Sequence, residues 1–111
     1  MQINDYEKSV LRTANETLTP LEQLTNGLMG LNGEAGEVID ILKKHLYQGH
    51  ELDREHIVKE LGDVAWYLTI SAHAIGVDLE TVMQMNVDKL KARYPNGFEA
   101  EHSLHRNPDD I

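Results

Sequence analysis

The sequence of 111 residues predicts an all-α protein made of four helices in a single domain, residues 1–111. Apolar residues recur at steps of three and four along four segments, which is the spacing of one helix face. No segment alternates apolar and polar residues as a half-buried strand does. We therefore expect a four-helix bundle without a sheet, its core within about residues 20–98, followed by a polar C-terminal tail over residues 99–111.

A capping sequence separates the first two predicted helices. Residues 2–18 carry apolar side chains at helical spacing and predict a first amphipathic helix. Thr19 is then a suitable N-cap, Pro20 fits the first helical position, and Glu22 completes a capping box. From Pro20 the apolar pattern continues as far as Leu46, so we expect a long second helix.

Glycine recurs at every third residue inside this second helix, at Gly27, Gly30, Gly33 and Gly36. Each interior glycine costs a helix about 1 kcal/mol relative to alanine. One interpretation is a helix that breaks or kinks near Gly30. The other is a continuous helix with a strip free of side chains, where another backbone, a metal shell or a ligand comes close.

The third and fourth predicted helices each begin at an aspartate. Asp53 caps a helix that stops at Gly76, and Asp78 caps a helix that ends at Pro95. The third helix is apolar on more than one face, so we expect it to be the most buried element. We expect the polar tail to lie over the surface or to reach a partner subunit.

Composition and charge restrict the class of protein. The chain has no cysteine, which excludes disulfides and thiolate metal sites and is typical of a reducing compartment. Its first residues lack the basic start and apolar run of a signal peptide, and no apolar run reaches the roughly 20 residues of a membrane span. The formal net charge of −9 argues against a surface that follows nucleic-acid phosphates. We expect a cytoplasmic protein that binds neither nucleic acid nor a membrane.

Two pairs of carboxylates are the main candidates for chemistry. Glu34 and Glu37 lie three residues apart in the second helix, and Glu60 and Asp63 lie three residues apart in the third. Residues at this spacing share a helix face, so two adjacent helices would direct four carboxylates at one point. An oxygen-only ligand set suits Mg²⁺ or Mn²⁺. The alternative is a set of buried ion pairs with nearby lysines, namely Lys43, Lys44 or Lys59.

The fourth helix carries a second candidate group. Asn86, Lys89 and Arg93 share one face and would suit a polyphosphate chain, although an ordinary exposed face has the same appearance. Trp66 and Tyr67 follow Asp63 by three and four residues and project from nearly the same face. Either ring could contact a base or a phosphate, but a lone tryptophan in a small helical protein more often lies in the core.

At these residues the sequence resembles the MazG-like nucleotide pyrophosphohydrolases, an all-α family. That family has Glu-x-x-Glu on one helix and Glu-x-x-Asp on the next, and residues 33–38 and 60–67 match both motifs in order and spacing. Residues 86–98, which end in Tyr-Pro-Asn-Gly-Phe, resemble the family's C-terminal segment. The likeness covers roughly residues 20–98.

The resemblance implies hydrolysis of a nucleoside triphosphate between its α and β phosphates, giving the monophosphate and pyrophosphate. It implies Mg²⁺, or Mn²⁺, as the cofactor, and it assigns both the metal-binding and the catalytic roles to Glu34, Glu37, Glu60 and Asp63. The substrate-binding residues that it implies are Lys44, Tyr67, Asn86, Lys89 and Arg93.

The sequence departs from the family pattern at Gly33. Some members carry another glutamate just before the first motif acid, where it can serve as the general base. With glycine at that position, either a motif carboxylate accepts the proton of the attacking water or the metal ions alone generate hydroxide.

The resemblance also implies a homodimer or a dimer of dimers that completes its core and its site between subunits. Four helices in about 95 residues carry enough apolar positions to leave apolar surface to bury. Related hydrolases, such as a dimeric dUTPase or phosphoribosyl-ATP pyrophosphohydrolase, share the motif and are alternatives. A non-catalytic helical module that binds metal or nucleotide is the alternative outside the enzymes.

Overall fold

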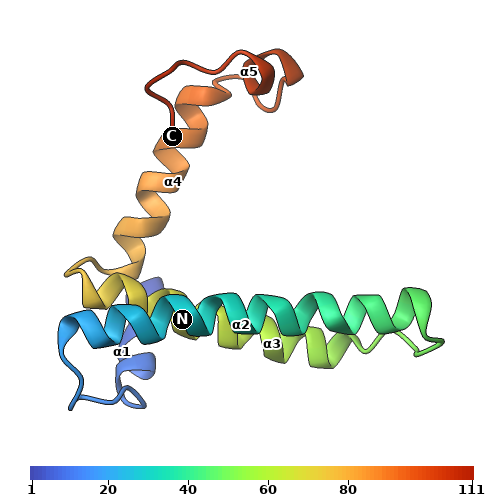
Figure 1. Cartoon of the computed structure of the whole chain (residues 1–111). Coiled ribbons are helices and arrows are strands. Elements are labelled where there is room, and N and C mark those ends of the chain that lie inside the picture. The colour runs from blue at the N-terminus through green and yellow to red at the C-terminus, as the bar shows by residue number, and fades with distance from the viewer.

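The computed structural model describes all residues from 1 to 111 and is entirely helical (Figure 1). Its helices are α1 (Ile3–Leu11), α2 (Pro20–Tyr47), α3 (Arg54–Ala74), α4 (Leu79–Arg93) and α5 (Ala100–Leu104). The four predicted helices are present, but the first ends at Leu11 instead of continuing toward residue 18. The short α5 within the tail is an addition that the sequence did not predict. None of the helices combines the length and the apolar composition that crossing a membrane requires.

The predicted helix caps are present. The Thr19 side chain accepts a hydrogen bond from the Glu22 backbone N–H at 3.2 Å, and the Glu22 carboxylate accepts one from the Thr19 N–H at 2.9 Å. Asp53 and Asp78 cap α3 and α4 by accepting from backbone N–H groups at 3.0 and 2.8 Å. These bonds satisfy donors that have no partner inside the helix.

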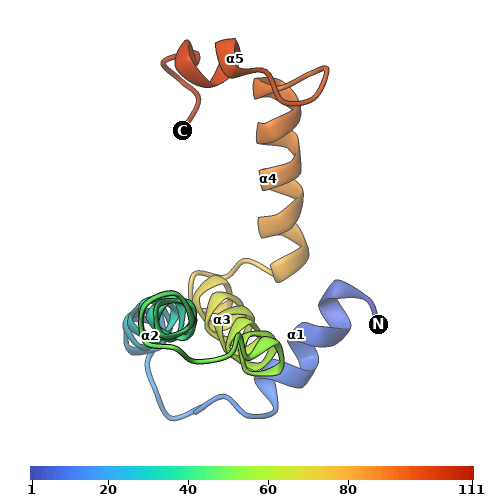
Figure 2. The ribbon, with the colours of Figure 1, turned by 90° about the vertical axis from the view of Figure 1, so that its right-hand side faces the viewer.

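The two longest helices, α2 and α3, pack side by side and antiparallel (Figures 1 and 2). α2 continues without a break through all four glycines, so the interpretation of a break near Gly30 is wrong. A Cβ added at Gly27 would overlap the Ser71 hydroxyl and lie 3.2 Å from the Ser71 backbone nitrogen. A Cβ at Gly30 would overlap the Tyr67 ring. These two glycines therefore let α3 approach, which confirms a close approach of another helix at half of the glycine strip.

The other two glycines of the strip face open space. No atom lies within 4 Å of a Cβ built at Gly33 or Gly36. No neighbouring residue of the same chain therefore explains why these two positions are glycine.

Burial is concentrated in α3, as the sequence predicted. Only seven of the 111 residues are buried, and four of these are consecutive residues of α3, namely Thr69, Ile70, Ser71 and Ala72. The remaining three, Val10, Gly27 and Leu79, come from α1, α2 and the start of α4. The core of the single chain is thus a small cluster at one end of the α2–α3 pair, where α1 and α4 meet it.

A single chain does not close the predicted four-helix bundle. α4 points away from the α2–α3 pair instead of packing along it (Figures 1 and 2). The Asn4 amide on α1 donates to Asp78 at 3.3 Å and to Glu80 at 3.2 Å, which fastens only the first turn of α4. The radius of gyration is 17.1 Å, against about 13 Å for a compact domain of this length.

The glycine contacts predict opposite effects of two similar substitutions. Gly27→Ala should lower the free energy of unfolding by roughly 1–3 kcal/mol, because the new methyl group meets the Ser71 backbone. Gly33→Ala should raise it by up to about 1 kcal/mol, because no atom opposes the methyl group and alanine favours the helix. Urea unfolding of both variants measures the difference. Equal stability of the two variants would contradict the assigned helix contact.

Candidate metal centre

Three carboxylates from two helices meet between α2 and α3. One oxygen from each of Glu34, Glu60 and Asp63 lies within 4.8 Å of the other two. Glu60 and Asp63 share a face of α3 because they are three residues apart, and Glu34 faces them from α2. Glu34 and Glu60 are half-buried, whereas Asp63 is exposed. The structure therefore brings together three of the four predicted acids.

The fourth predicted acid, Glu37, lies beside this group but outside it. Its side chain is exposed and is not one of the three that converge. Its negative charge still contributes to raising the pKa of Glu34, so the two carboxyls are near each other.

The like charges raise the proton affinity of the site. The pKa of Glu34 rises from its ordinary value of 4.5 to about 7. The largest cause is a hydrogen bond shared with Glu60, followed by desolvation and then by the charges of Glu60, Asp63 and Glu37. Without a cation, the site therefore binds a proton at Glu34 below about pH 7, which reduces the repulsion.

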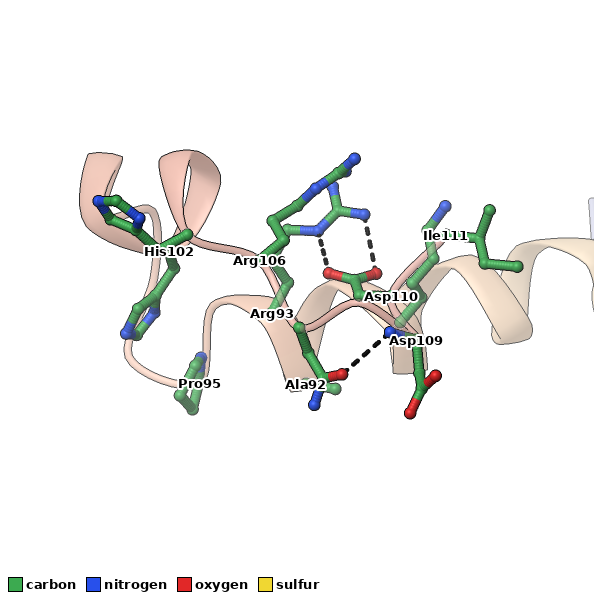
Figure 3. Close-up of a pocket in the computed structure, with 11 residues that line it drawn as sticks. Ala92, Arg93, Pro95, His102, Arg106, Asp109, Asp110 and Ile111 are labelled. Atoms are coloured by element: carbon green, nitrogen blue, oxygen red, sulfur yellow. Dashed lines mark hydrogen bonds and ion pairs between the residues drawn. The ribbon is translucent and has the colours of Figure 1, made fainter.

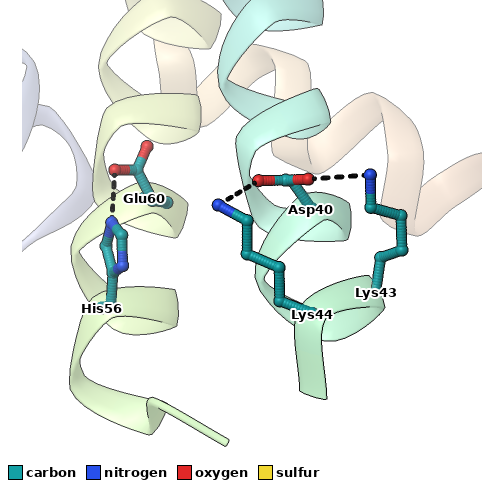
Figure 4. A network of polar contacts seen from close by, with 5 residues as sticks. All are labelled: Asp40, Lys43, Lys44, His56 and Glu60. Atoms are coloured by element: carbon teal, nitrogen blue, oxygen red, sulfur yellow. Dashed lines mark hydrogen bonds and ion pairs between the residues drawn. The ribbon is translucent and has the colours of Figure 1, made fainter. Parts of the chain in front are cut away.

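Glu60 is the most constrained of the three acids. Its side chain is 16% exposed, and its Oε1 atom accepts a hydrogen bond from His56 Nε2 at 3.2 Å (Figure 4). Its Oε2 atom is shielded from solvent and has no hydrogen-bond partner when Glu34 is ionised. A buried carboxylate oxygen without a partner is costly, and a cation would remove that cost. The residues present therefore fit a divalent cation that prefers oxygen ligands, such as Mg²⁺ or Mn²⁺.

His56 is a functional candidate that the sequence analysis did not assign. It holds Glu60 from one turn earlier on α3, in the manner of residues that orient metal ligands from outside the ligand shell. The available signal was its spacing of four residues from Glu60, which is common on helices and insufficient alone.

The alternative of lysine ion pairs is wrong. Lys43 and Lys44 both pair with Asp40, at 3.3 and 3.0 Å (Figure 4). Lys59 pairs with Glu55 at 3.6 Å. None of the four motif acids forms an ion pair with a lysine, so no lysine compensates the charge of the convergent carboxylates. Lys44, a predicted substrate-binding residue, is held by Asp40 in this arrangement.

The predicted polyphosphate stripe lies far from the carboxylates of the same chain. Asn86, Lys89 and Arg93 lie on the outer part of α4, which extends away from α2 and α3 (Figure 1). At 1.5 Å per residue, Arg93 lies about 21 Å along α4 from Leu79. Arg93 is bonded instead to Asp110 of the tail, through contacts of 2.6 and 2.9 Å (Figure 3).

The two aromatic candidates have packing roles. Trp66 Nε1 donates to Thr13 Oγ1 at 2.9 Å, which ties α3 to the segment after α1. Its ring meets Tyr67 edge-on, with ring centres 5.1 Å apart. Tyr67 fills the space above Gly30 and is half-buried.

Comparison with known proteins agrees with this geometry. The family model described as the MazG nucleotide pyrophosphohydrolase domain matches residues 22–98. The chain belongs to this family. The match includes all four motif acids and the stripe on α4, whereas α1 and the tail after residue 98 lie outside it. The MazG-like resemblance noted in the sequence is thereby confirmed, together with its all-helical fold.

A curated relative is similar over most of its length. The protein called Gene 37 protein, from Mycobacterium phage L5, is 40% identical over 81 residues, which span 69% of this chain and 71% of the relative. No solved structure matches the chain. The MazG family is generally one of nucleotide pyrophosphohydrolases, and the acidic cluster is a fitting site for the divalent metal that such proteins typically use.

The raised pKa of Glu34 predicts a pH dependence of stability in metal-free protein. At Glu34 the folded state binds a proton more tightly than the unfolded state does. The stability that this proton adds to the folded state is therefore complete below pH 4.5 and is lost as the pH rises past about 7. The melting temperature of wild type should therefore fall relative to that of Glu34→Gln as the pH rises from 5 to 8.

Thermal unfolding in EDTA at several pH values measures this difference. Comparison with the variant cancels the carboxyls whose pKa is lowered, which act in the opposite direction and are common to both proteins: Glu22, Asp40, Asp78 and Asp110. Parallel curves for the two proteins would show that Glu34 does not carry the raised pKa.

Proposed function

We propose that the protein is a metal-dependent nucleoside triphosphate pyrophosphohydrolase that cleaves between the α and β phosphates. The observation that carries the proposal is the convergence of Glu34, Glu60 and Asp63 without a lysine partner. Membership of the MazG family supports the substrate class. The reaction gives a nucleoside monophosphate and pyrophosphate.

In this proposal Glu34, Glu60 and Asp63 hold Mg²⁺, with Mn²⁺ as an alternative, and rotation of the exposed Glu37 side chain adds a fourth ligand. A bound divalent cation supplies charge neutralisation for the phosphates and lowers the pKa of water. His56 keeps the Glu60 carboxylate oriented. Because these groups lie on two long helices, their separation is well defined before any ligand arrives.

The cationic and polar groups of the proposal neutralise and position the polyphosphate. Lys89 and Arg93 supply positive charge, with Arg93 able to form two parallel hydrogen bonds to phosphate oxygens. Asn86 on the same helix adds an amide, and Lys44 and Tyr67 lie on the α2 and α3 side of the site. For α4 to reach the substrate, its stripe must come from another chain.

A second copy of the chain is the partner that this proposal requires. Large apolar side chains are exposed along α2 and α4, among them Leu21, Met29, Ile39, Leu46, Met83 and Met85. An open chain with so few buried residues leaves much of its apolar surface exposed to solvent. A homodimer, or a dimer of dimers, would bury it.

The faces of α4 favour this arrangement. Met83, Val87 and Leu90 are 40, 42 and 39% exposed and form one apolar stripe. Lys89 and Arg93 lie about a quarter turn around the helix from that stripe. Packing of the apolar stripe on a second chain would place the cationic stripe at the edge of the contact, where a substrate can reach it.

Other hydrolases of the superfamily remain alternatives within the same chemistry. A dUTPase-like enzyme and a phosphoribosyl-ATP pyrophosphohydrolase would use the same carboxylates and differ in the pocket for base and sugar. A non-catalytic module would bind metal or nucleotide without turnover.

Pyrophosphate release tests the reaction directly. Purified protein is mixed with canonical and modified nucleoside triphosphates, dUTP and phosphoribosyl-ATP, in Mg²⁺, in Mn²⁺ or in EDTA. We expect metal-dependent pyrophosphate and monophosphate from at least one triphosphate, and none in EDTA, because the carboxylates alone repel the substrate. Metal binding with no pyrophosphate from any substrate would favour the non-catalytic module.

Mixing two inactive chains tests whether the site is shared. Glu60→Gln damages the carboxylate side and Lys89→Gln damages the cationic side, so a mixed dimer holds one intact site. Statistical reassociation of equal amounts should restore about a quarter of wild-type activity. The matched control mixes Glu60→Gln with Glu34→Gln, which damages the carboxylate cluster of every chain and should restore none. Failure of the first mixture to recover would contradict a shared site.

A further inference from the structure

The C-terminal tail and the end of α4 line an open cavity of about 790 Å³ (Figure 3). Its wall includes Lys89 and Arg93 from α4, and His102, Arg106 and Asp110 from the tail. The volume lies within the range of small-molecule sites, roughly 300–1,000 Å³. The α4 side of the wall lies inside the family match, whereas the tail side lies outside it, so the shared MazG domain supplies only part of this cavity.

One carboxylate of the tail occupies the cationic wall of this cavity. Asp110 accepts hydrogen bonds from Arg93 at 2.6 Å and 2.9 Å, one to each oxygen. The two side chains are only 12% and 14% exposed. The pKa of Asp110 is lowered chiefly by Arg93, with Arg106 and Lys89 also contributing, so three cations act on one carboxylate.

Two of these three cations have no ion-pair partner. Arg93 is neutralised by Asp110, whereas Lys89 and Arg106 form no ion pair within 4.0 Å. This concentration stands out in a chain of net charge −9 with ten lysines and arginines. The wall also carries Asp109, so three cations face two carboxylates, which leaves one positive charge, or two once Asp110 moves away. The cavity can then attract an anion with more charge than a single carboxylate.

The geometry points to an anion-binding site for a phosphate-bearing ligand in this cavity, with Asp110 as an internal competitor that must leave Arg93 when the ligand binds. The planar guanidinium of Arg93 presents two parallel donors, which match phosphate oxygens as well as they match a carboxylate. Lys89 and Arg106 then neutralise the further charges of a polyphosphate. The ion pair between Arg93 and Asp110 closes the site. The measured affinity is therefore the affinity of the open site multiplied by the fraction of molecules in which this ion pair is broken.

The ligand has two possible sources with the same chemistry. It can be the polyphosphate of the proposed substrate, in which case the inference rests on the proposed function and the tail regulates substrate binding. It can also be a free anion such as inorganic phosphate, pyrophosphate or tripolyphosphate. Both sources require the same displacement of Asp110.

Calorimetric titration with inorganic tripolyphosphate in EDTA tests the site without turnover and without the metal centre. We expect Asp110→Asn and Asp110→Ala to bind tripolyphosphate about fivefold more tightly than wild type, because Arg93 is freed. Asp109→Asn is the matched control, since it removes the same charge from the same wall but no ion pair, and should change affinity less than about twofold. Arg93→Gln should lose most of the binding.

The results separate the possible sources and the possible failures. Tighter tripolyphosphate binding with a lower KM for the nucleotide in Asp110→Asn assigns the site to the substrate, and an unchanged KM assigns it to a free anion. If no variant turns over a nucleotide, the proposed function fails while the calorimetric result still stands. The inference would be overturned if both Asp110 variants bound tripolyphosphate no more tightly than Asp109→Asn, or more weakly than wild type.

Discussion

The close contact of α2 with α3 is the constraint on which the rest of the structure depends. Gly27 lies against Ser71 and Gly30 against Tyr67, so one turn forward along α2 is matched by one turn back along α3. The same register brings Glu34 of α2 to Glu60 and Asp63, which lie one turn apart on α3. Larger residues at the two glycines would separate the helices and move the carboxylates apart. The distances between the clustered carboxylates thus depend on two glycines that lie several residues away.

The cluster itself opposes folding when no cation is present. Three carboxylates within 4.8 Å, a raised pKa at Glu34 and an unpartnered oxygen of Glu60 are each unfavourable. The chain does not relieve this with the nearby Lys43, Lys44 or Lys59, which pair with Asp40 and Glu55 instead. Unfavourable electrostatics retained in this way are typical of sites that bind a ligand of opposite charge.

Much of the fold was predictable because the relevant signals are local. The caps at Thr19, Asp53 and Asp78 and the apolar spacing determine where the helices begin and how they continue. The direction of α4 was not predictable, because its contacts are with residues distant in the chain, such as Asn4, which bonds Asp78 from more than 70 residues earlier. The role of the glycines was open for the same reason, since their neighbours belong to another helix.

The candidate site was predictable in part. The spacing of the motif acids placed Glu34, Glu60 and Asp63 on facing helices, but spacing alone does not determine the rotamer that leaves Glu37 outside the group. His56 was visible only as a common helical spacing, and the bond between Arg93 and Asp110 joins a helix to an irregular tail that has no periodic pattern.

Direct Mn²⁺ binding tests the central claim that these carboxylates form a divalent metal site. Electron paramagnetic resonance measures free Mn²⁺ in titrations of wild type and Glu60→Gln without nucleotide, and thermal unfolding of the same samples reports stability. The account predicts Mn²⁺ binding by wild type, a loss of more than about tenfold in Glu60→Gln, and metal-free Glu60→Gln at least as stable as wild type, because repulsion is reduced. Unchanged Mn²⁺ affinity in Glu60→Gln, together with a lower melting temperature, would contradict the account and leave Glu60 with a structural role.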